Sequence, residues 1–305
     1  MDGKLLRNYA RLIARSGINV VKGQEVIIRT EPEQTDFVEL LAEECYLAGA
    51  GKVTADWRFL PLTRLDIQYQ SPETLGGVEK WQEERLRHNA ETLPAMIYLD
   101  SDDPDGLDGT DQEKWAAAQQ ARYKITRPYR DAMENKYQWC VAAVPGKKWA
   151  KKVFPALSGH EAEEKLWELI LRCSRADGPD PLAAWEEHNR NLSRRCRWLN
   201  ELRLKKLIYK SESTGTDFQV GLMPQMLFCG GEEALPGKGV MFNANIPSEE
   251  VFTTPMRGEA EGIVYATMPL SYQGVLIESF SLRFEKGRVV EARAEKNEEA
   301  PKQMI

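Results

Sequence analysis

Residues 25–57 read EVIIRTEPEQTDFVELLAEECYLAGAGKVTADW. The stretch opens with the buried-strand pattern Glu25-Val-Ile-Ile-Arg29 and closes with a second strand pattern at Lys52–Trp57. Between them the apolar residues recur at helical spacing: Phe37, Leu40, Leu41 and Cys45. One face of the intervening segment is therefore that of a buried helix. Two β-branched runs joined by an amphipathic helix predict a βαβ unit, and hence a parallel sheet.

The same alternation extends to both sides of this stretch. Helical spacing recurs in residues 5–13, 78–89 and 112–121, and strand patterns recur in residues 95–99 and 138–144. The first part of the chain is therefore predicted to be an α/β domain built on a parallel sheet.

The texture of the chain changes near residue 200. Two predicted helices, His160–Arg172 and Pro181–Leu199, lead to a series of short strands: residues 206–210, 216–222, 262–268, 274–284 and 289–296. We therefore predict two domains, residues 1–200 and 201–305, the second one β-rich. Residues 297–305 resemble the start of a helix, with Pro301 tolerated in its first turn. A domain that stops as an element begins is expected to be incomplete.

Composition excludes several classes of protein. The chain has 305 residues, of which 42% are hydrophobic and 29% charged, as in a soluble globular protein of about two domains. Its net charge of −6 does not favour a nucleic-acid partner, and no apolar run approaches the ~20 residues of a membrane span. Five scattered cysteines without a close pair predict reduced thiols, mostly core residues, in a cytoplasmic protein.

Several tempting motifs are better explained structurally. Gly237-Lys-Gly239 lacks the third glycine of a dinucleotide fingerprint and predicts a turn. The aspartate-rich segment Asp100–Asp111 lacks two anchoring ligands of a calcium loop, so we predict a solvated loop that ends in a helix cap. His160 lacks the second imidazole of a zinc helix, because Glu164 stands one turn on, and Ser158 is expected to cap that helix. We expect His88 and His188, which sit among charged residues, to be exposed.

One segment retains a chemical interpretation, Asn243-Ala-Asn-Ile-Pro-Ser-Glu-Glu-Val-Phe-Thr-Thr-Pro255, hereafter the Glu249–Glu250 loop. Neighbouring side chains of an extended segment point in opposite directions, so Glu249 and Glu250 are expected to play different parts. A carboxylate held in a rigid loop can bind a hard metal ion or act as a general base. The residues alone leave a solvated acidic turn as the alternative.

This loop resembles the hallmark of the M29 metallo-aminopeptidases, and the resemblance extends over the whole chain. It also includes Gly215-Thr-Asp-Phe-Gln-Val220, Pro145-Gly-Lys-Lys-Trp149 and the hairpins after Glu261. The resemblance implies a Rossmann-like α/β domain followed by a catalytic domain that removes N-terminal residues from peptides. It implies two divalent metal ions, zinc or cobalt, with magnesium and manganese as further candidates. It also implies a homodimer, Glu250 as a ligand of one metal, and Glu249 as a support of the loop.

The chain departs from the family pattern in its ligands. The family's bridging glutamate, two histidines and aspartate have no recognisable counterpart here. One carboxylate cannot hold a metal pair ~3.5–4 Å apart, so we expect a truncated catalytic domain and a chain that is inactive alone. The alternative is a non-catalytic remnant that serves as a binding or dimerisation module. A small-molecule transferase that uses the α/β half is a third reading, without a cofactor motif to support it.

Overall fold

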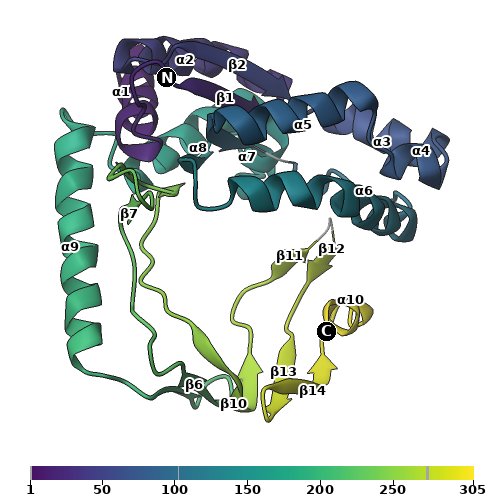
Figure 1. Cartoon of the computed structure of the whole chain (residues 1–305). Helices are drawn as coiled ribbons and strands as arrows, with labels where there is room; N and C mark the ends of the chain where they lie inside the picture. The colour runs from purple at the N-terminus through teal and green to yellow at the C-terminus, as the bar shows by residue number, and fades with distance from the viewer. Residues whose placement is uncertain (1, 102, 273–274) are drawn as a thin grey trace. The chain divides into compact units, whose positions relative to one another are not determined.

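A computed structural model describes residues 2–101, 103–272 and 275–305. The chain forms two compact units, and both of them are discontinuous in sequence (Figure 1). The first unit comprises residues 1–189 and 232–248, and the second comprises residues 190–231 and 249–305. The chain is thus a mixed α/β protein, as predicted, in which the segment 232–248 returns to the N-terminal unit after the β-rich region has begun.

The first unit is built on a parallel sheet with the strand order β2-β1-β3-β4-β9. Its strands are β1 (Glu25–Thr30), β2 (Lys52–Trp57), β3 (Ala95–Asp100), β4 (Trp139–Ala143) and β9 (Asn245–Ile246). The register places Val26 beside Val53 on one side and beside Ala95 on the other. The first four strands match the predicted ones closely, whereas β9 is a two-residue strand that the sequence pattern did not predict.

Helices surround this sheet, and Figure 1 shows them along the purple-to-teal part of the chain. They are α1 (Gly3–Leu12), α2 (Thr35–Ala48), α3 (Leu60–Tyr69), α4 (Pro72–Gly76), α5 (Lys80–Thr92), α6 (Gln112–Met133), α7 (Lys147–Val153), α8 (Gly159–Cys173) and α9 (Pro181–Glu201). A single-turn π-helix, Ile13–Gly17, continues α1, and a 3-10 turn, Pro32–Gln34, precedes α2. The long α9 begins in the first unit and ends in the second.

The main core lies between the sheet and residues of α1, α2, α7, α8 and α9. Strand residues Ile28 and Ile97 are completely buried in it, and Tyr9, Phe37 and Trp167 bring aromatic rings from α1, α2 and α8. The rings of Phe37 and Trp167 lie 5.3 Å apart, a distance at which aromatic pairs attract one another beyond their burial. Strand β9 adds Ile246 to the same core, which explains why the returning segment belongs to the first unit.

The returning segment begins with a small hairpin. Strands β7 (Glu233–Ala234) and β8 (Met241–Phe242) pair in antiparallel fashion, and the backbone of Gly237 and Gly239 has positive φ between them. Glycine adopts that conformation without steric cost, so the predicted turn at Gly237–Gly239 is confirmed. The hairpin buries Leu235 and Phe242 in a small cluster of its own.

The second unit is organised around an antiparallel sheet with the order β14-β13-β10-β6-β5. Its strands are β5 (Lys206–Ser211), β6 (Thr216–Leu222), β10 (Pro255–Tyr265), β13 (Ser281–Glu285) and β14 (Arg288–Arg293). A ribbon of β11 (Leu270–Tyr272) and β12 (Val275–Ile277) and a helix, α10 (Glu299–Met304), complete the unit. The predicted strand 274–284 is in fact two strands, and its first residue, Gly274, lies outside the described residues. None of the described helices is both long enough and apolar enough to span a bilayer.

Candidate functional site

The Glu249–Glu250 loop begins as the edge strand of the parallel sheet. Within β9, Asn245 and Ile246 stand in register with Val141 and Ala142 of β4. The carbonyl oxygen of Ala244 accepts a hydrogen bond of 2.8 Å from the Val141 amide. The backbone at the start of the loop is therefore held in place as part of the sheet.

In addition to its hydrogen bonds to β4, the loop is held by one of its own side chains and by side chains of α1 and α9. The buried Asn243 donates from Nδ2 to the carbonyl oxygen and to Oγ of Ser16, at 3.0 Å each. The Tyr9 hydroxyl lies 3.4 Å from the Ile246 carbonyl oxygen, and Nε2 of His188 lies 2.6 Å from that of Ser248. Burial is the main cause that raises the pKa of Tyr9 well above its ordinary range, so its hydroxyl stays protonated. Its one hydrogen is shared between the Ala143 carbonyl oxygen, 3.0 Å away, and the more distant Ile246 carbonyl oxygen. The loop is thus tied down on alternate residues up to Ser248.

Glu249 and Glu250 come directly after the last of these ties, and both are exposed. They are the first residues of the loop that belong to the second unit. There, Cys229 and Phe252 exchange two backbone hydrogen bonds of 2.9 Å, and Val251 packs against the cluster that contains Phe228. The two carboxylates therefore stand on a short stretch whose backbone is anchored before and after them.

The donor chemistry of Glu250 fits one ligand of a hard divalent cation, because an exposed carboxylate on an anchored backbone offers oxygen to such an ion. It does not amount to a metal centre. Over residues 2–101, 103–272 and 275–305, no group of three or more His, Cys, Asp or Glu side chains is arranged to hold a metal ion. The assignment of Glu250 as a ligand stays a prediction.

The histidines fall into two kinds. His88 is half-exposed beside Glu25, as expected. His160 is exposed at the start of α8, where Ser158 caps the helix as predicted and Glu161 completes a capping box with it. The prediction for His188 was wrong: only 6% of the residue is exposed, and its ring bonds the Ser248 carbonyl.

Charged neighbours concealed the burial of His188. Glu186, Glu187 and Arg190 flank it in sequence, yet on a helix these side chains turn away from its face. The buried residues of α9 recur at positions 185, 188, 189 and 192, which is the spacing of a helix face. That spacing was the signal that identifies His188 as an interior residue.

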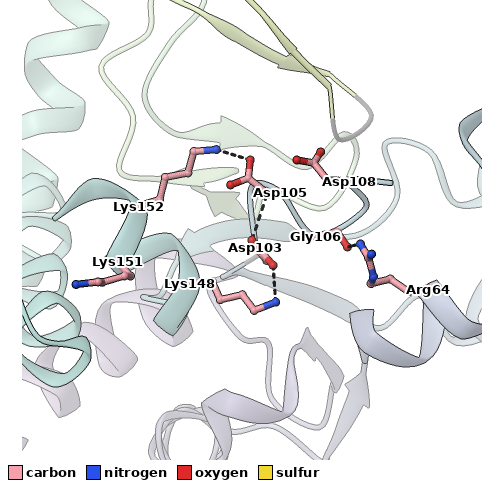
Figure 2. Close-up of a pocket in the computed structure, with 8 residues that line it drawn as sticks. All are labelled: Arg64, Asp103, Asp105, Gly106, Asp108, Lys148, Lys151 and Lys152. Carbon is pink, nitrogen blue, oxygen red and sulfur yellow. Dashed lines mark hydrogen bonds and ion pairs between the residues drawn. The ribbon is translucent and has the colours of Figure 1, made fainter. Parts of the chain in front are cut away.

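The aspartate-rich segment lines a cavity of about 700 Å³ in the first unit (Figure 2). The lining residues are Arg64, Asp103, Asp105, Gly106, Asp108, Lys148, Lys151 and Lys152. Lys148 Nζ lies 2.8 Å from Asp103 Oδ2, Lys152 pairs with Asp105, and Arg64 donates to the Gly106 carbonyl oxygen at 2.7 Å. These contacts fasten the segment to α7 and α3, with lysine ammonium groups beside the two aspartates.

The end of the aspartate-rich segment behaves as predicted. Asp111 is the N-cap of α6, and its Oδ1 accepts a hydrogen bond of 2.9 Å from the Lys114 amide. Most of the cysteines are also core residues, as predicted, because Cys45, Cys140 and Cys196 are buried.

Comparison with known proteins bears directly on this loop and its scaffold. A family model described as thermophilic metalloprotease (M29) matches residues 2–305. The chain is 39% identical over 301 residues to aminopeptidase T of Thermus thermophilus, and 36% identical over 301 residues to aminopeptidase AmpS of Bacillus subtilis. Each alignment covers 98% of this chain and 73% of the relative.

The fold gives the same result. The solved structure of wild-type AmpT from Thermus thermophilus matches with a TM-score of 0.89 at 38% identity, again over 98% of this chain and 73% of that one. These shares describe the aligned segments and do not by themselves support the predicted truncation, which stays a prediction. The resemblance seen in the sequence is confirmed, and the chain belongs to the thermophilic metalloprotease family, M29.

Proposed function

We propose that the protein is a metal-dependent aminopeptidase that removes N-terminal residues from peptides. The observation that carries the proposal is the Glu249–Glu250 loop, anchored on both sides, in a chain that aligns over 98% of its length with proteins named aminopeptidases. The family description, a metalloprotease, supports the requirement for divalent metal ions. We propose two per active site, zinc or cobalt, with magnesium and manganese as further candidates.

Each part of the loop has its own task in this proposal. Glu250 would be a ligand of one metal, and Glu249 would support the loop. A divalent metal pair, when bound, supplies an activated water and polarises the scissile carbonyl. Asn243, Tyr9 and His188 hold the backbone that presents the carboxylate, so that little ordering remains to be done when a ligand arrives.

We further propose that the protein is a cytoplasmic homodimer. Exposed apolar side chains support the dimer: Phe59, Leu62, Leu65 and Tyr69, along α3 and the residue before it, are each more than half exposed. Apolar groups gathered in one segment of a surface mark an interaction site more often than scattered ones do. Sedimentation analysis of the wild type beside a Leu62→Lys, Leu65→Lys double variant tests the assignment. We expect the wild type to be a dimer and the double variant to be a monomer.

A non-catalytic binding or dimerisation module is the alternative function. It is favoured by one observation, that the described residues contain no group of three potential metal ligands. The expectation that the chain is inactive alone, drawn from its one recognisable ligand, agrees with this alternative and is at odds with the aminopeptidase proposal.

A paired assay separates the two functions. The purified chain is loaded with Co²⁺ or Zn²⁺, and release of the first residue is followed from a peptide and from its N-acetylated form. The aminopeptidase proposal expects release from the free peptide only, and its loss on chelation. Absence of release at saturating metal would establish the non-catalytic alternative for this chain.

A further inference from the structure

A buried histidine lies beneath the Glu249–Glu250 loop. His188, on α9, is 6% exposed, and its Nε2 stands 2.6 Å from the carbonyl oxygen of Ser248. A carbonyl oxygen can only accept, so Nε2 carries the hydrogen and donates it. The imidazole therefore holds the last residue before the two glutamates.

The ring of His188 is itself fixed by packing. Trp185, one turn earlier on α9, is 1% exposed and meets the imidazole edge-on, with ring centroids 5.2 Å apart and an interplanar angle of 64°. The Arg175 guanidinium carbon lies 5.7 Å from the centroid of the Trp185 ring. A ring enclosed in this way has few orientations open to it, so its hydrogen bond has a defined direction.

The position of the accepting oxygen gives the contact its consequence. The Ser248 carbonyl belongs to the same planar peptide group as the amide nitrogen and Cα of Glu249. Fixing that oxygen therefore fixes the orientation of the Ser248–Glu249 peptide plane, and this restricts the backbone directions available to Glu250. The Tyr9 hydroxyl lies 3.0 Å from the Ala143 carbonyl oxygen and 3.4 Å from that of Ile246, two residues before Ser248, so it does not set this last plane.

We propose that His188 is a positioning residue that sets the Ser248–Glu249 peptide plane and thereby the direction in which the loop presents the Glu250 carboxylate. This inference rests on the proposed function, because the direction of the Glu250 carboxylate matters only if Glu250 is a metal ligand. The role requires a donor at this position that reaches the Ser248 oxygen, and it does not require an ionisable group.

Two substitutions separate this role from that of an ordinary core residue. His188→Gln retains a side-chain donor of similar reach, whereas His188→Phe retains an aromatic ring against Trp185 and removes the donor. His88→Gln, at a half-exposed histidine, is the matched control for the chemical change. If His188→Phe fails to fold, His188→Leu replaces it with a smaller apolar side chain.

The readout is hydrogen–deuterium exchange of the full chain without added metal. We expect His188→Phe to raise exchange of the amides of residues 249–252 by about 2- to 12-fold, the effect of losing one hydrogen bond. Exchange in β1 should stay unchanged, and His188→Gln and His88→Gln should resemble the wild type. Unchanged exchange at residues 249–252, an equal rise in β1, or no rescue by glutamine would overturn the proposal.

The wild-type protein provides a second test that involves no substitution. With ¹⁵N-labelled histidine, a protonated Nε2 of His188 gives an N–H resonance protected from solvent exchange, and we expect to observe it. An unprotonated Nε2 would contradict the proposed bond. Both measurements proceed without turnover, so a failed aminopeptidase assay leaves them decisive. If turnover is observed, His188→Phe should lower kcat more than it raises KM, with recovery in His188→Gln.

Discussion

The carbonyl oxygen of Glu250 lies directly against Gly230. A Cβ placed on Gly230 would come within 2.4 Å of that oxygen, closer than van der Waals contact allows. The neighbouring Cys229 and Phe252 exchange backbone hydrogen bonds, so neither strand can easily move away. Residue 230 must therefore be glycine for the backbone of Glu250 to keep its place.

Gly230→Ala is expected to displace the loop or destabilise it. Overfilling a packed position costs about 1–3 kcal/mol, and here the clash is with backbone that cannot rotate away. The free energy of unfolding, from denaturant titration, should fall by that amount. Gly178→Ala is the control, because a Cβ on Gly178 meets nothing within 4 Å. Equal stability of the two variants would contradict the close approach.

Asn243 and Asn245 form a matched pair within one loop. Asn243 is 4% exposed and donates to Ser16, whereas Asn245 is exposed. Asn243→Ala removes two side-chain hydrogen bonds to the half-buried Ser16, so it should lower the free energy of unfolding by about 1–3 kcal/mol. Asn245→Ala should have little effect. Similar losses in both variants would mean that the anchoring is not specific to Asn243.

The two glutamates are predicted to differ in metal binding. Glu250→Gln removes the proposed ligand, and we expect Co²⁺ affinity to fall more than tenfold, since loss of outer-shell contacts alone costs about 10–100-fold. Glu249→Gln keeps a polar side chain of the same length for its part in the loop, so the affinity should fall less than in Glu250→Gln. Calorimetric titration of both variants measures the difference, and a larger loss in Glu249→Gln would reverse the assignment.

Acid should weaken the first unit partly through Asp56. Although burial opposes it, the guanidinium groups of Arg29 and Arg85 lower the pKa of Asp56 below its usual 3.8. A carboxyl whose pKa is lowered by folding stabilises the protein above its unfolded pKa, and this contribution disappears as the pH falls through the folded value. Wild-type stability should therefore fall more steeply below about pH 4 than that of Asp56→Asn. Parallel curves would exclude this ion pair as a cause.

Local sequence patterns were sufficient for the elements with strong periodicity. The runs in residues 25–30 and 95–100 are apolar enough to identify central strands, and the helix from Phe37 onward shows a clear buried face. Strand β9 was not predicted, because a strand of two residues is too short to show an alternating apolar pattern. Its place at the sheet edge depends on the pairing of Asn245 with Val141, which are far apart in the chain.

Only part of the candidate site could be predicted, because contacts between residues far apart in the chain leave no local pattern in the sequence. Glu250 was identified through its surrounding motif, which is contiguous in sequence. Tyr9 and His188 reach the loop from helices at positions remote from it, so no contiguous motif contains them. The burial of His188 was readable from the spacing of Trp185, His188 and Leu192, but the charged residues between them dominated the local composition.

The proposed function is tested by measuring metal content and peptidase activity in one preparation of the chain, beside Glu250→Gln. We predict bound metal, release of the N-terminal residue from a free peptide, and loss of both in the variant. Activity that survives chelation or the Glu250→Gln substitution would contradict it, as would a metal-saturated chain that releases nothing.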